Sequence, residues 1–130
     1  MKKLILCLNI ILLITTIACK NTYPDHSSDI ISDALTHAEK KLQDKGYKTA
    51  SSFKPNDYLR FRIMVEDDTS NETAKEMVLE FLNALEEKLG DLSEFKKSHK
   101  ISFELKSKDK DKVLLSGKIE GDNNEIWWQF

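Results

Sequence analysis

Cysteine and histidine are the side chains of this chain best able to bind a metal ion or to act as nucleophile and base. The 130-residue sequence has two cysteines, Cys7 and Cys19, and three histidines, His26, His37 and His99. Structural metal sites need several such ligands at short spacings, and only His26 lies near a cysteine. No histidine has a second ligand four residues away. We therefore expect all three histidines to be solvated, and we predict no metal site and no cofactor.

The segment that begins at Asp109 starts like a calcium-binding loop. Asp109 and Asp111 occupy its first and third places, and Glu120 falls at the twelfth. The fifth and sixth places are Val113 and Leu114, where such a loop needs an oxygen ligand and glycine. The segment is therefore not a calcium site.

Carboxylates recur at helical spacing at Glu72, Glu76, Glu80 and Glu87. General acid–base chemistry needs carboxylates in a cleft that moves their pKa values apart. These four lie opposite an apolar stripe, so they face solvent on a solubilising surface, with an acidic docking stripe as the alternative. No nucleophile–base–orienter set is visible either. We predict that the protein is not an enzyme.

Cys19 follows a positively charged start and a short apolar run, Leu4 to Ile17. At 1.5 Å per residue that run reaches roughly 21 Å, short of a bilayer core of about 30 Å. Such a run, ending in the small residue Ala18, is typical of a secretory signal. Because Cys7 would leave with the signal, the mature chain would keep one cysteine and no internal disulfide.

The segment Thr16-Ile17-Ala18-Cys19 resembles the lipobox of bacterial lipoproteins. Ile17 and Ala18 match it, and Thr16 stands where leucine is preferred. The resemblance implies a signal peptide at residues 1–18, diacylglyceryl transfer to the Cys19 sulfur and cleavage between Ala18 and Cys19. Acylation of the new amino group, by a fatty acid such as palmitate, often follows. We expect a lipid anchor on the extracytoplasmic face of the cell membrane.

Residues 19–27 are predicted to be the lipidated cysteine and a short tether, and residues 28–130 a single domain. The eight residues after Cys19 reach at most about 27 to 29 Å, so the domain stays near its membrane. That closeness favours a membrane or envelope protein as partner. Cleavage leaves 18 basic and 22 acidic residues, a net charge of −4, which argues against nucleic acid and against lying on anionic lipid.

Apolar periodicity predicts a helix, two strands, a second helix and three strands. The first helix has Ser28 as its N-cap and ends at Gly46, and the second has a capping box from Thr69 to Glu72 and ends at Gly90. The strands are predicted at residues 47–53, 58–67, 100–106, 112–120 and 125–130, with a turn at 54–57 and polar loops at 107–111 and 121–124. Because two amphipathic helices need one sheet face to cover, we predict an α+β two-layer sandwich with both helices on one face of a mainly antiparallel sheet of about five strands.

Alternation assigns the strand side chains to two faces. The predicted inward positions are Leu59, Phe61, Ile63, Val65, Ile101, Phe103, Leu105, Val113, Leu115, Ile119, Ile126, Trp128 and Phe130. Tyr58, Arg60, Arg62 and Trp127 then share the opposite face. Arginine, tyrosine and tryptophan are enriched at binding hot spots, so these four are the candidate partner-binding residues. The alternative is that Trp127 packs on the aliphatic stems of neighbouring Arg or Lys side chains.

The stretches "DKGYK" and "IWWQF" are similar to parts of small Gram-positive lipoproteins found on integrative conjugative elements, some of which act in exclusion. The resemblance implies a non-catalytic binding module that blocks or modulates a membrane-embedded partner such as conjugation machinery. Two alternatives stay open. One is a small-solute-binding lipoprotein, which usually needs a cleft between two domains, and the other is a surface enzyme of unknown class.

Replacing the predicted lipidation site tests the anchor. Cys19→Ala should abolish labelling by a fatty-acid probe, and should either release the domain from the membrane or leave an uncleaved precursor. The domain itself should still fold, because no disulfide depends on Cys19. Normal cleavage with detergent-dependent membrane attachment in Cys19→Ala would contradict the prediction.

Overall fold

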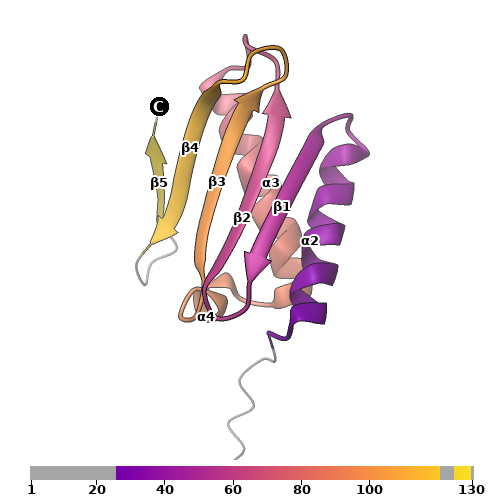
Figure 1. Cartoon of the computed structure of the whole chain (residues 1–130), viewed down its shortest axis with the longest axis vertical. Helices are drawn as coiled ribbons and strands as arrows, with labels where there is room; N and C mark the ends of the chain where they lie inside the picture. The colour runs from indigo at the N-terminus through magenta and orange to yellow at the C-terminus, as the bar shows by residue number, and fades with distance from the viewer. Residues whose placement is uncertain (1–25, 121–124, 130) are drawn as a thin grey trace, which may run out of the picture.

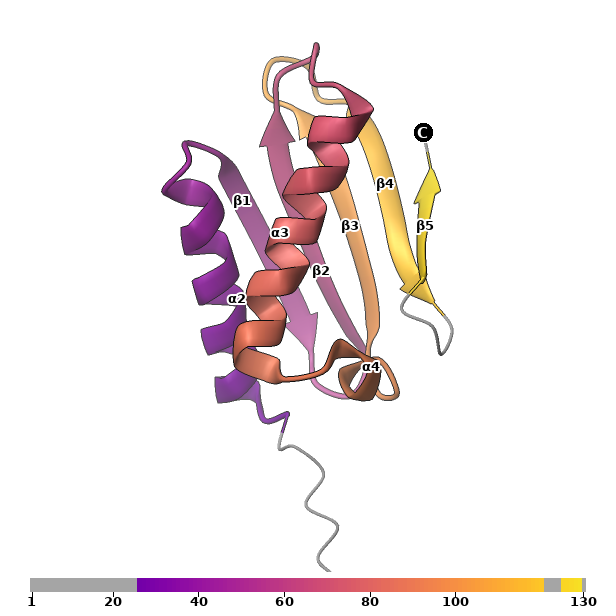
Figure 2. The same ribbon diagram turned by 180° about the vertical axis from the view of Figure 1, so that it is seen from behind.

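The chain folds into two layers, with helices on one face of a single sheet (Figure 1; Figure 2). The computed structural model describes residues 26–120 and 125–129. The elements in chain order are α2 (Ser28–Gln43), β1 (Lys48–Lys54), β2 (Tyr58–Val65), α3 (Asn71–Leu89), α4 (Leu92–Phe95), β3 (Lys100–Ser107), β4 (Val113–Glu120) and β5 (Glu125–Gln129). The predicted order and the α+β class are confirmed. The short helix α4 was not predicted.

The five strands lie in the sheet in the order of the sequence, from β1 to β5. Strands β1 and β2 pair antiparallel, as do β3 with β4 and β4 with β5. Strands β2 and β3 pair parallel. Two parallel neighbouring strands need a long crossover connection between them. The segment that contains α3 and α4 makes this connection. The predicted mainly antiparallel sheet is therefore confirmed, with one parallel pair at its centre.

Both long helices bury the predicted stripes, but their N-caps differ from the prediction by one residue. The cap of α2 is Ser27, in extended conformation, and its side chain makes no capping hydrogen bond; the predicted Ser28 is already helical. The cap of α3 is Ser70, whose Oγ accepts the Thr73 backbone N–H at 3.1 Å. The predicted capping box at Thr69 is therefore wrong, because helical dihedrals begin after Ser70.

Gly90 ends α3 as predicted, whereas α2 ends at Gln43, with Asp44 as its cap, three residues before the predicted Gly46. Gly46 has φ of 89° in the turn after α2, and Gly90 has φ of 80° as the cap of α3. Both values lie in the left-handed region, which costs glycine little and other residues much more.

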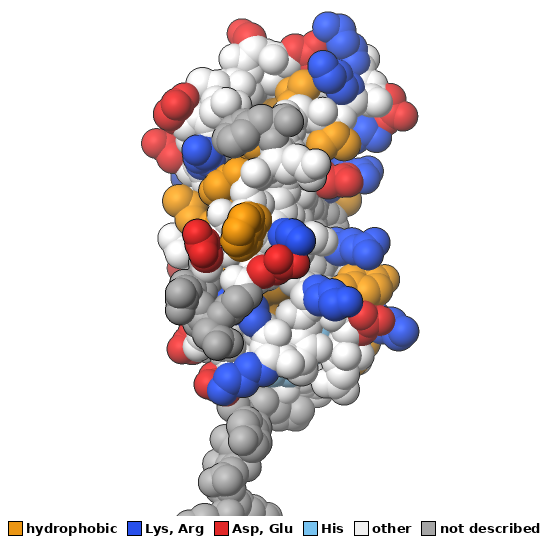
Figure 3. Space-filling model, turned by 90° about the vertical axis from the view of Figure 1, so that its left-hand side faces the viewer, with side chains coloured by type: hydrophobic (Ala, Val, Ile, Leu, Met, Phe, Trp, Pro, Cys, Tyr) orange, Lys and Arg blue, Asp and Glu red, His pale blue; other side chains and the backbone are white. Residues whose placement is uncertain are grey.

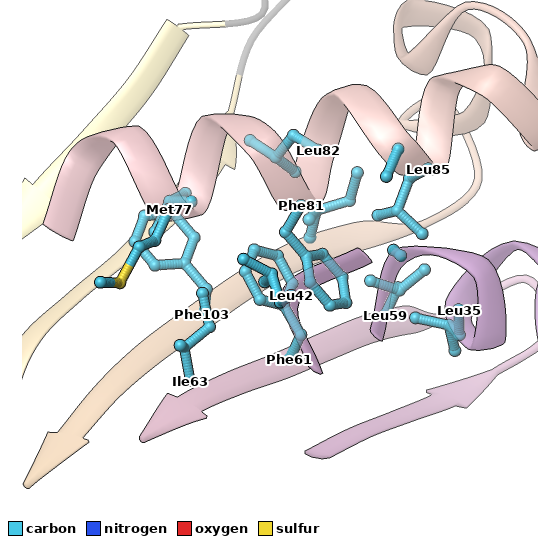
Figure 4. Close-up of a cluster of buried hydrophobic side chains, with 14 of the residues drawn as sticks. Leu35, Leu42, Leu59, Phe61, Ile63, Met77, Phe81, Leu82, Leu85 and Phe103 are labelled. Atoms are coloured by element: carbon cyan, nitrogen blue, oxygen red, sulfur yellow. The ribbon is translucent and has the colours of Figure 1, made fainter. Parts of the chain in front are cut away.

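Aromatic stacking between the layers forms the centre of the core (Figure 4). Phe61 of β2 stacks on Phe81 of α3, with ring centroids 4.0 Å apart and planes 12° apart. Phe103 of β3, the cross-strand partner of Phe61, stacks beside it with ring centroids 5.5 Å apart. All three rings are 2% exposed or less. The inward alternation predicted for β2 and β3 is thus confirmed.

Strand β4 departs from the predicted alternation at its start. Leu105 pairs with Leu115, but Lys106 pairs with Val113, so the register shifts between Leu105 and Lys106. The extra residue, Leu114, turns Val113 to the side of Lys106, where Val113 is 42% exposed. The prediction of an inward Val113 is therefore wrong, because sequence alternation carries no information on bulges.

Several predictions concern residues outside the described range. They are the signal peptide at residues 1–18, Cys19 with most of the tether, the loop at residues 121–124 and the inward position of Phe130. Among the helices that the structure describes, none combines the length and apolar character needed to cross a membrane.

The stacked core predicts a large difference between two adjacent residues. Phe61→Ala should lower the free energy of unfolding by about 3 to 5 kcal/mol, because it removes a buried ring and leaves a cavity. Arg60→Ala, the matched control, should change it by less than about 0.5 kcal/mol, because Arg60 is exposed on the other face. Chemical denaturation of both variants measures the difference. Equal losses would mean that the two faces have been exchanged.

Candidate protein-binding face of the sheet

The outer face of the sheet, defined as the face turned away from α2 and α3, is not covered by any helix of the described chain (Figure 1; Figure 2). Strand registers bring the predicted binding residues of β2 and β5 to this face. Arg60 lies across from Ser102, Ser102 from Lys118, and Lys118 from Trp127. Tyr58, Arg60, Arg62 and Trp127 are therefore on one surface, although β3 and β4 separate Trp127 from the others.

A shallow hollow of about 830 Å³ occupies the middle of the outer face. Small side chains line it at Ser102 and Ser116 in the middle of the sheet and at Ala50 and Ser52 on the edge strand β1. Longer side chains lie next to them in the strand registers: Arg60, Arg62, Glu104, Lys118, Trp127 and Gln129. Small residues next to long ones make the hollow, because a sheet face with uniform side chains would be flat.

The two arginines are held differently. The Arg60 guanidinium stacks on the Tyr58 ring, with Cζ 4.6 Å from the ring centroid. Arg62 instead donates from Nε at 3.1 Å and from Nη2 at 2.7 Å to Glu104 Oε2. Both members of the Arg62 pair are more than 40% exposed, so the pair adds little to stability and mainly orients the side chains.

Trp127 is 56% exposed, the most exposed large apolar side chain of the described residues. Its cross-strand partner on the same face is Lys118, so a lysine stem lies beside it, as the alternative prediction requires. Figure 3, which views the molecule from the β5 side, shows hydrophobic side chains exposed among charged ones. An exposed tryptophan beside cations is typical of protein-binding surfaces.

Gly117 sets how closely β5 and Phe103 approach β4. A Cβ at Gly117 would collide with the Phe103 ring and lie 2.6 Å from the Trp127 carbonyl oxygen. Trp128, on the inner side of β5, packs edge-on against Phe103 with centroids 5.2 Å apart. The inner packing of Trp128 therefore fixes Trp127 on the outer face, because adjacent residues of a strand point to opposite sides.

The acidic stripe of α3 is divided by its contacts with α2. Glu80 pairs with Lys45 at 2.7 Å. Glu87 accepts from Lys41 at 2.5 Å and lies 2.6 Å from His37 Nε2. Hydrogen bonds from Lys41 and then His37 lower the pKa of the Glu87 carboxyl. Half of the predicted stripe thus links the two helices, and only the exposed Glu72 and Glu76 remain as a docking surface.

The prediction that all three histidines are solvated is wrong. His37 contacts Glu87, and the His26 ring packs edge-on against Phe95 with centroids 5.0 Å apart. His99 is 3% exposed and stacks on Phe95 at 4.0 Å. Within the described ranges, no group of three or more histidine, cysteine or acidic side chains is placed to hold a metal ion.

His99 forms a hydrogen bond with the β1–β2 turn at one end of the sheet. That turn is the predicted one: the Asp57 N–H donates to the Lys54 carbonyl at 3.1 Å, with Asn56 at φ 58°. The Asn56 backbone N–H donates to His99 Nε2 at 2.9 Å. This assigns the ring proton to Nδ1, which faces the Phe95 carbonyl at 3.2 Å. Sequence reading missed this role because it depends on residues 43 positions apart.

Ser107 and Asp67 form a polar cluster that sequence reading also missed. The Ser107 hydroxyl, on a 2% exposed residue, donates to the Asp67 carboxylate and accepts the Lys110 backbone N–H at 2.8 Å. Lys110 also pairs with Asp67 at 2.7 Å, and its hydrogen bond, followed by that of Ser107, lowers the pKa of Asp67. The cluster ties the β3–β4 loop to the end of β2. Among the described residues, no histidine is hydrogen-bonded to the Ser107 hydroxyl. The contacts of Ser107 therefore stabilise the loop and do not resemble those of an activated nucleophile.

Comparison with known proteins finds a likeness of fold and none of sequence. The chain matches no protein-family model and no curated protein sequence. Its fold is similar to the crystal structure of the sex pheromone staph-cAM373 precursor, with a TM-score of 0.55 and 15% sequence identity. The likeness covers 83% of this chain and 39% of that one, so this chain spans well under half the length of its structural neighbour. At this identity the likeness shows a shared fold alone.

The buried His99 predicts how stability depends on pH. Burial lowers the pKa of His99 below its ordinary value of 6.5, although the Phe95 carbonyl acts in the opposite direction. As pH falls below about 6.5, the unfolded chain binds a proton that the folded chain resists, so stability is greatest above that pH and falls below it. Melting curves from pH 7.5 to 5 should show this loss in the natural protein. The slope should be shallower in His99→Gln, which is also less stable at pH 7.5, and equal slopes would contradict the assignment.

Proposed function

We propose that the protein is a membrane-anchored extracytoplasmic lipoprotein that acts as a non-catalytic protein-binding module through the outer face of its sheet. The observation that carries the proposal is the uncovered hollow on that face, with exposed Trp127 and Arg60 at its sides. Both long helices pack on the inner face, so the outer face is not needed to close the core. Its aromatic and arginine side chains have the composition of a recognition surface.

The anchor half of the proposal rests on the sequence. A lipid on Cys19 would hold the domain within about 30 Å of the membrane through an eight-residue tether. Two or more acyl chains make such attachment stable. A domain held so close to the bilayer meets membrane and envelope proteins far more often than proteins in the medium, because tethering raises their effective concentration.

We further infer that the partner belongs to conjugation, with blocking or modulation of membrane-embedded transfer machinery as the specific form. Two independent likenesses support this setting. The stretches "DKGYK" and "IWWQF" resemble parts of small lipoproteins of conjugative elements, and the fold is similar to that of a sex pheromone precursor. A domain that binds without chemistry suits such a role, since occupying a surface of the machinery is sufficient to block it.

Alanine variants of the outer face test the proposal. Arg60→Ala, Arg62→Ala and Trp127→Ala should each weaken partner capture, typically by 2 kcal/mol or more, roughly thirtyfold in affinity. Their melting temperatures should barely change, because all three side chains are exposed. Capture is measured by crosslinking the full chain in its own membrane and quantifying the product. Leu79→Ala is the matched control, because Leu79 is 45% exposed on α3 in the other layer.

The same measurements show how the proposal would fail. Early melting of the three variants would mean that the face is part of the core. Normal melting with undiminished capture would move the site away from the outer face, and the exposed acidic pair Glu72 and Glu76 would be tested next.

A further inference from the structure

We propose that the partner presents an acidic segment, and that it lies on the transverse row, defined as Ser52, Arg60, Ser102, Lys118 and Trp127. In this arrangement a carboxylate of the partner is bound by Arg60 with the Ser102 hydroxyl beside it, and a large apolar side chain of the partner contacts Trp127. This inference rests on the proposed function and adds the chemistry of the partner to it.

The transverse row crosses all five strands at one level. Ser52 pairs with Arg60, Arg60 with Ser102, Ser102 with Lys118 and Lys118 with Trp127. Directly paired residues of neighbouring strands point to the same side of the sheet. The row therefore presents a hydroxyl between two cations, with an indole beyond the second cation.

Arg60 is the cation of the row whose charge is not neutralised. Arg62, next to it on β2, is bonded to Glu104, and Lys118 pairs with Glu120 at 2.7 Å. In the described part of the chain, Arg60 has no carboxylate partner; its guanidinium stacks on Tyr58. Stacking occupies a face of the guanidinium and leaves the N–H groups at its edge for a bidentate carboxylate.

The charge of the hollow is opposite to that of the chain. Three cations, Arg60, Arg62 and Lys118, line it against the single carboxylate of Glu104. Because Lys118 also pairs with Glu120 outside the lining, one positive charge, that of Arg60, has no acidic partner among the described residues. The whole sequence carries a net charge of −2. A positive hollow attracts a negative ligand and helps to orient it on the face.

The spacing of the row sets the spacing expected in the partner. Arg60 and Trp127 are three strand steps apart, about 14 Å at roughly 4.8 Å per step. An extended chain covers about 3.3 Å per residue. A partner segment that reaches both residues therefore places its acidic residue and its large apolar residue about four positions apart.

The shape of the hollow favours a protein segment over a lipid surface. Ser102 is only partly exposed, between the longer side chains of Arg60 and Lys118. A planar bilayer contacts the tips of protruding side chains and does not follow such a depression, whereas a single chain does.

Selection from a random peptide library on the purified full chain tests the inference. The enriched 12-residue peptides should carry Asp or Glu about four positions from an aromatic or large aliphatic residue. For a synthetic peptide of this kind, Arg60→Gln and Trp127→Ala should each weaken binding at least tenfold. Arg60→Lys should have a smaller effect, since it keeps the charge and loses the two-pronged contact. Lys48→Gln is the matched control, because it removes an exposed cation of the outer face outside the hollow.

A double-mutant cycle tests whether the acidic residue of the peptide contacts Arg60 directly. Replacing the acidic residue of the peptide by its amide should weaken binding to the natural protein at least tenfold and have little effect on Arg60→Gln. Additive losses would overturn the pairing of that residue with Arg60. Rising salt should weaken binding of the acidic peptide more than binding of its amide form.

The remaining outcomes separate this inference from the proposed function. Peptides that depend on Trp127 but not on Arg60 would overturn the acidic partner and leave the binding face intact. Peptides that depend on neither residue, or no enrichment above the Trp127→Ala background, would overturn both. Arg60-dependent binding to phosphatidylglycerol-containing vesicles without peptide binding would overturn the inference in favour of lipid. Arg60-dependent dimerisation in sedimentation would overturn it in favour of a second copy.

Discussion

The stacking of Phe61 on Phe81 is the contact on which the two-layer arrangement depends. It joins strand β2 to the helix α3, and Phe103 extends the stack to the central strand β3. Because β2 and β3 are parallel, the chain must cross the sheet between them, and α3 makes that crossing on the side of the stacked rings. Helix α2 then packs beside α3, and ion pairs of Glu80 and Glu87 join the two helices. Both long helices therefore lie on the same face of the sheet.

Because side chains alternate between the two faces of a strand, the packing of the core also determines which residues lie on the outer face. Each buried residue of β2 is followed by one that must point outward, so burying Phe61 places Arg60 and Arg62 outside. The same relation at β5 places Trp127 outside because Trp128 packs on Phe103. The close approach at Gly117 allows that packing. The candidate site is therefore the consequence of a core that fills only one side of the sheet.

Much of the fold could be predicted from the sequence because it depends on patterns among residues that are close together in the chain. Period-two alternation placed Phe61 and Arg60 on opposite faces, and Gly90 marked the end of α3. What the sequence did not contain was strand register. It therefore missed that Arg60, Ser102 and Lys118 are neighbours, that a bulge turns Val113 outward, and that His99 binds a turn 43 residues away. The N-cap of α3 was missed because Thr69 and Ser70 both suit a cap, and backbone dihedrals decide between them.

The central claim is that the protein binds its partner through the outer sheet face, and placing a photo-crosslinking amino acid on each layer tests it most directly. Ser102 lies in the middle of the hollow, and Glu76 lies exposed on α3 in the opposite layer. With the full chain in its own membrane, irradiation should join the probe at position 102 to a discrete protein product, and the probe at position 76 should give none. A product from position 76 with none from position 102 would contradict the account.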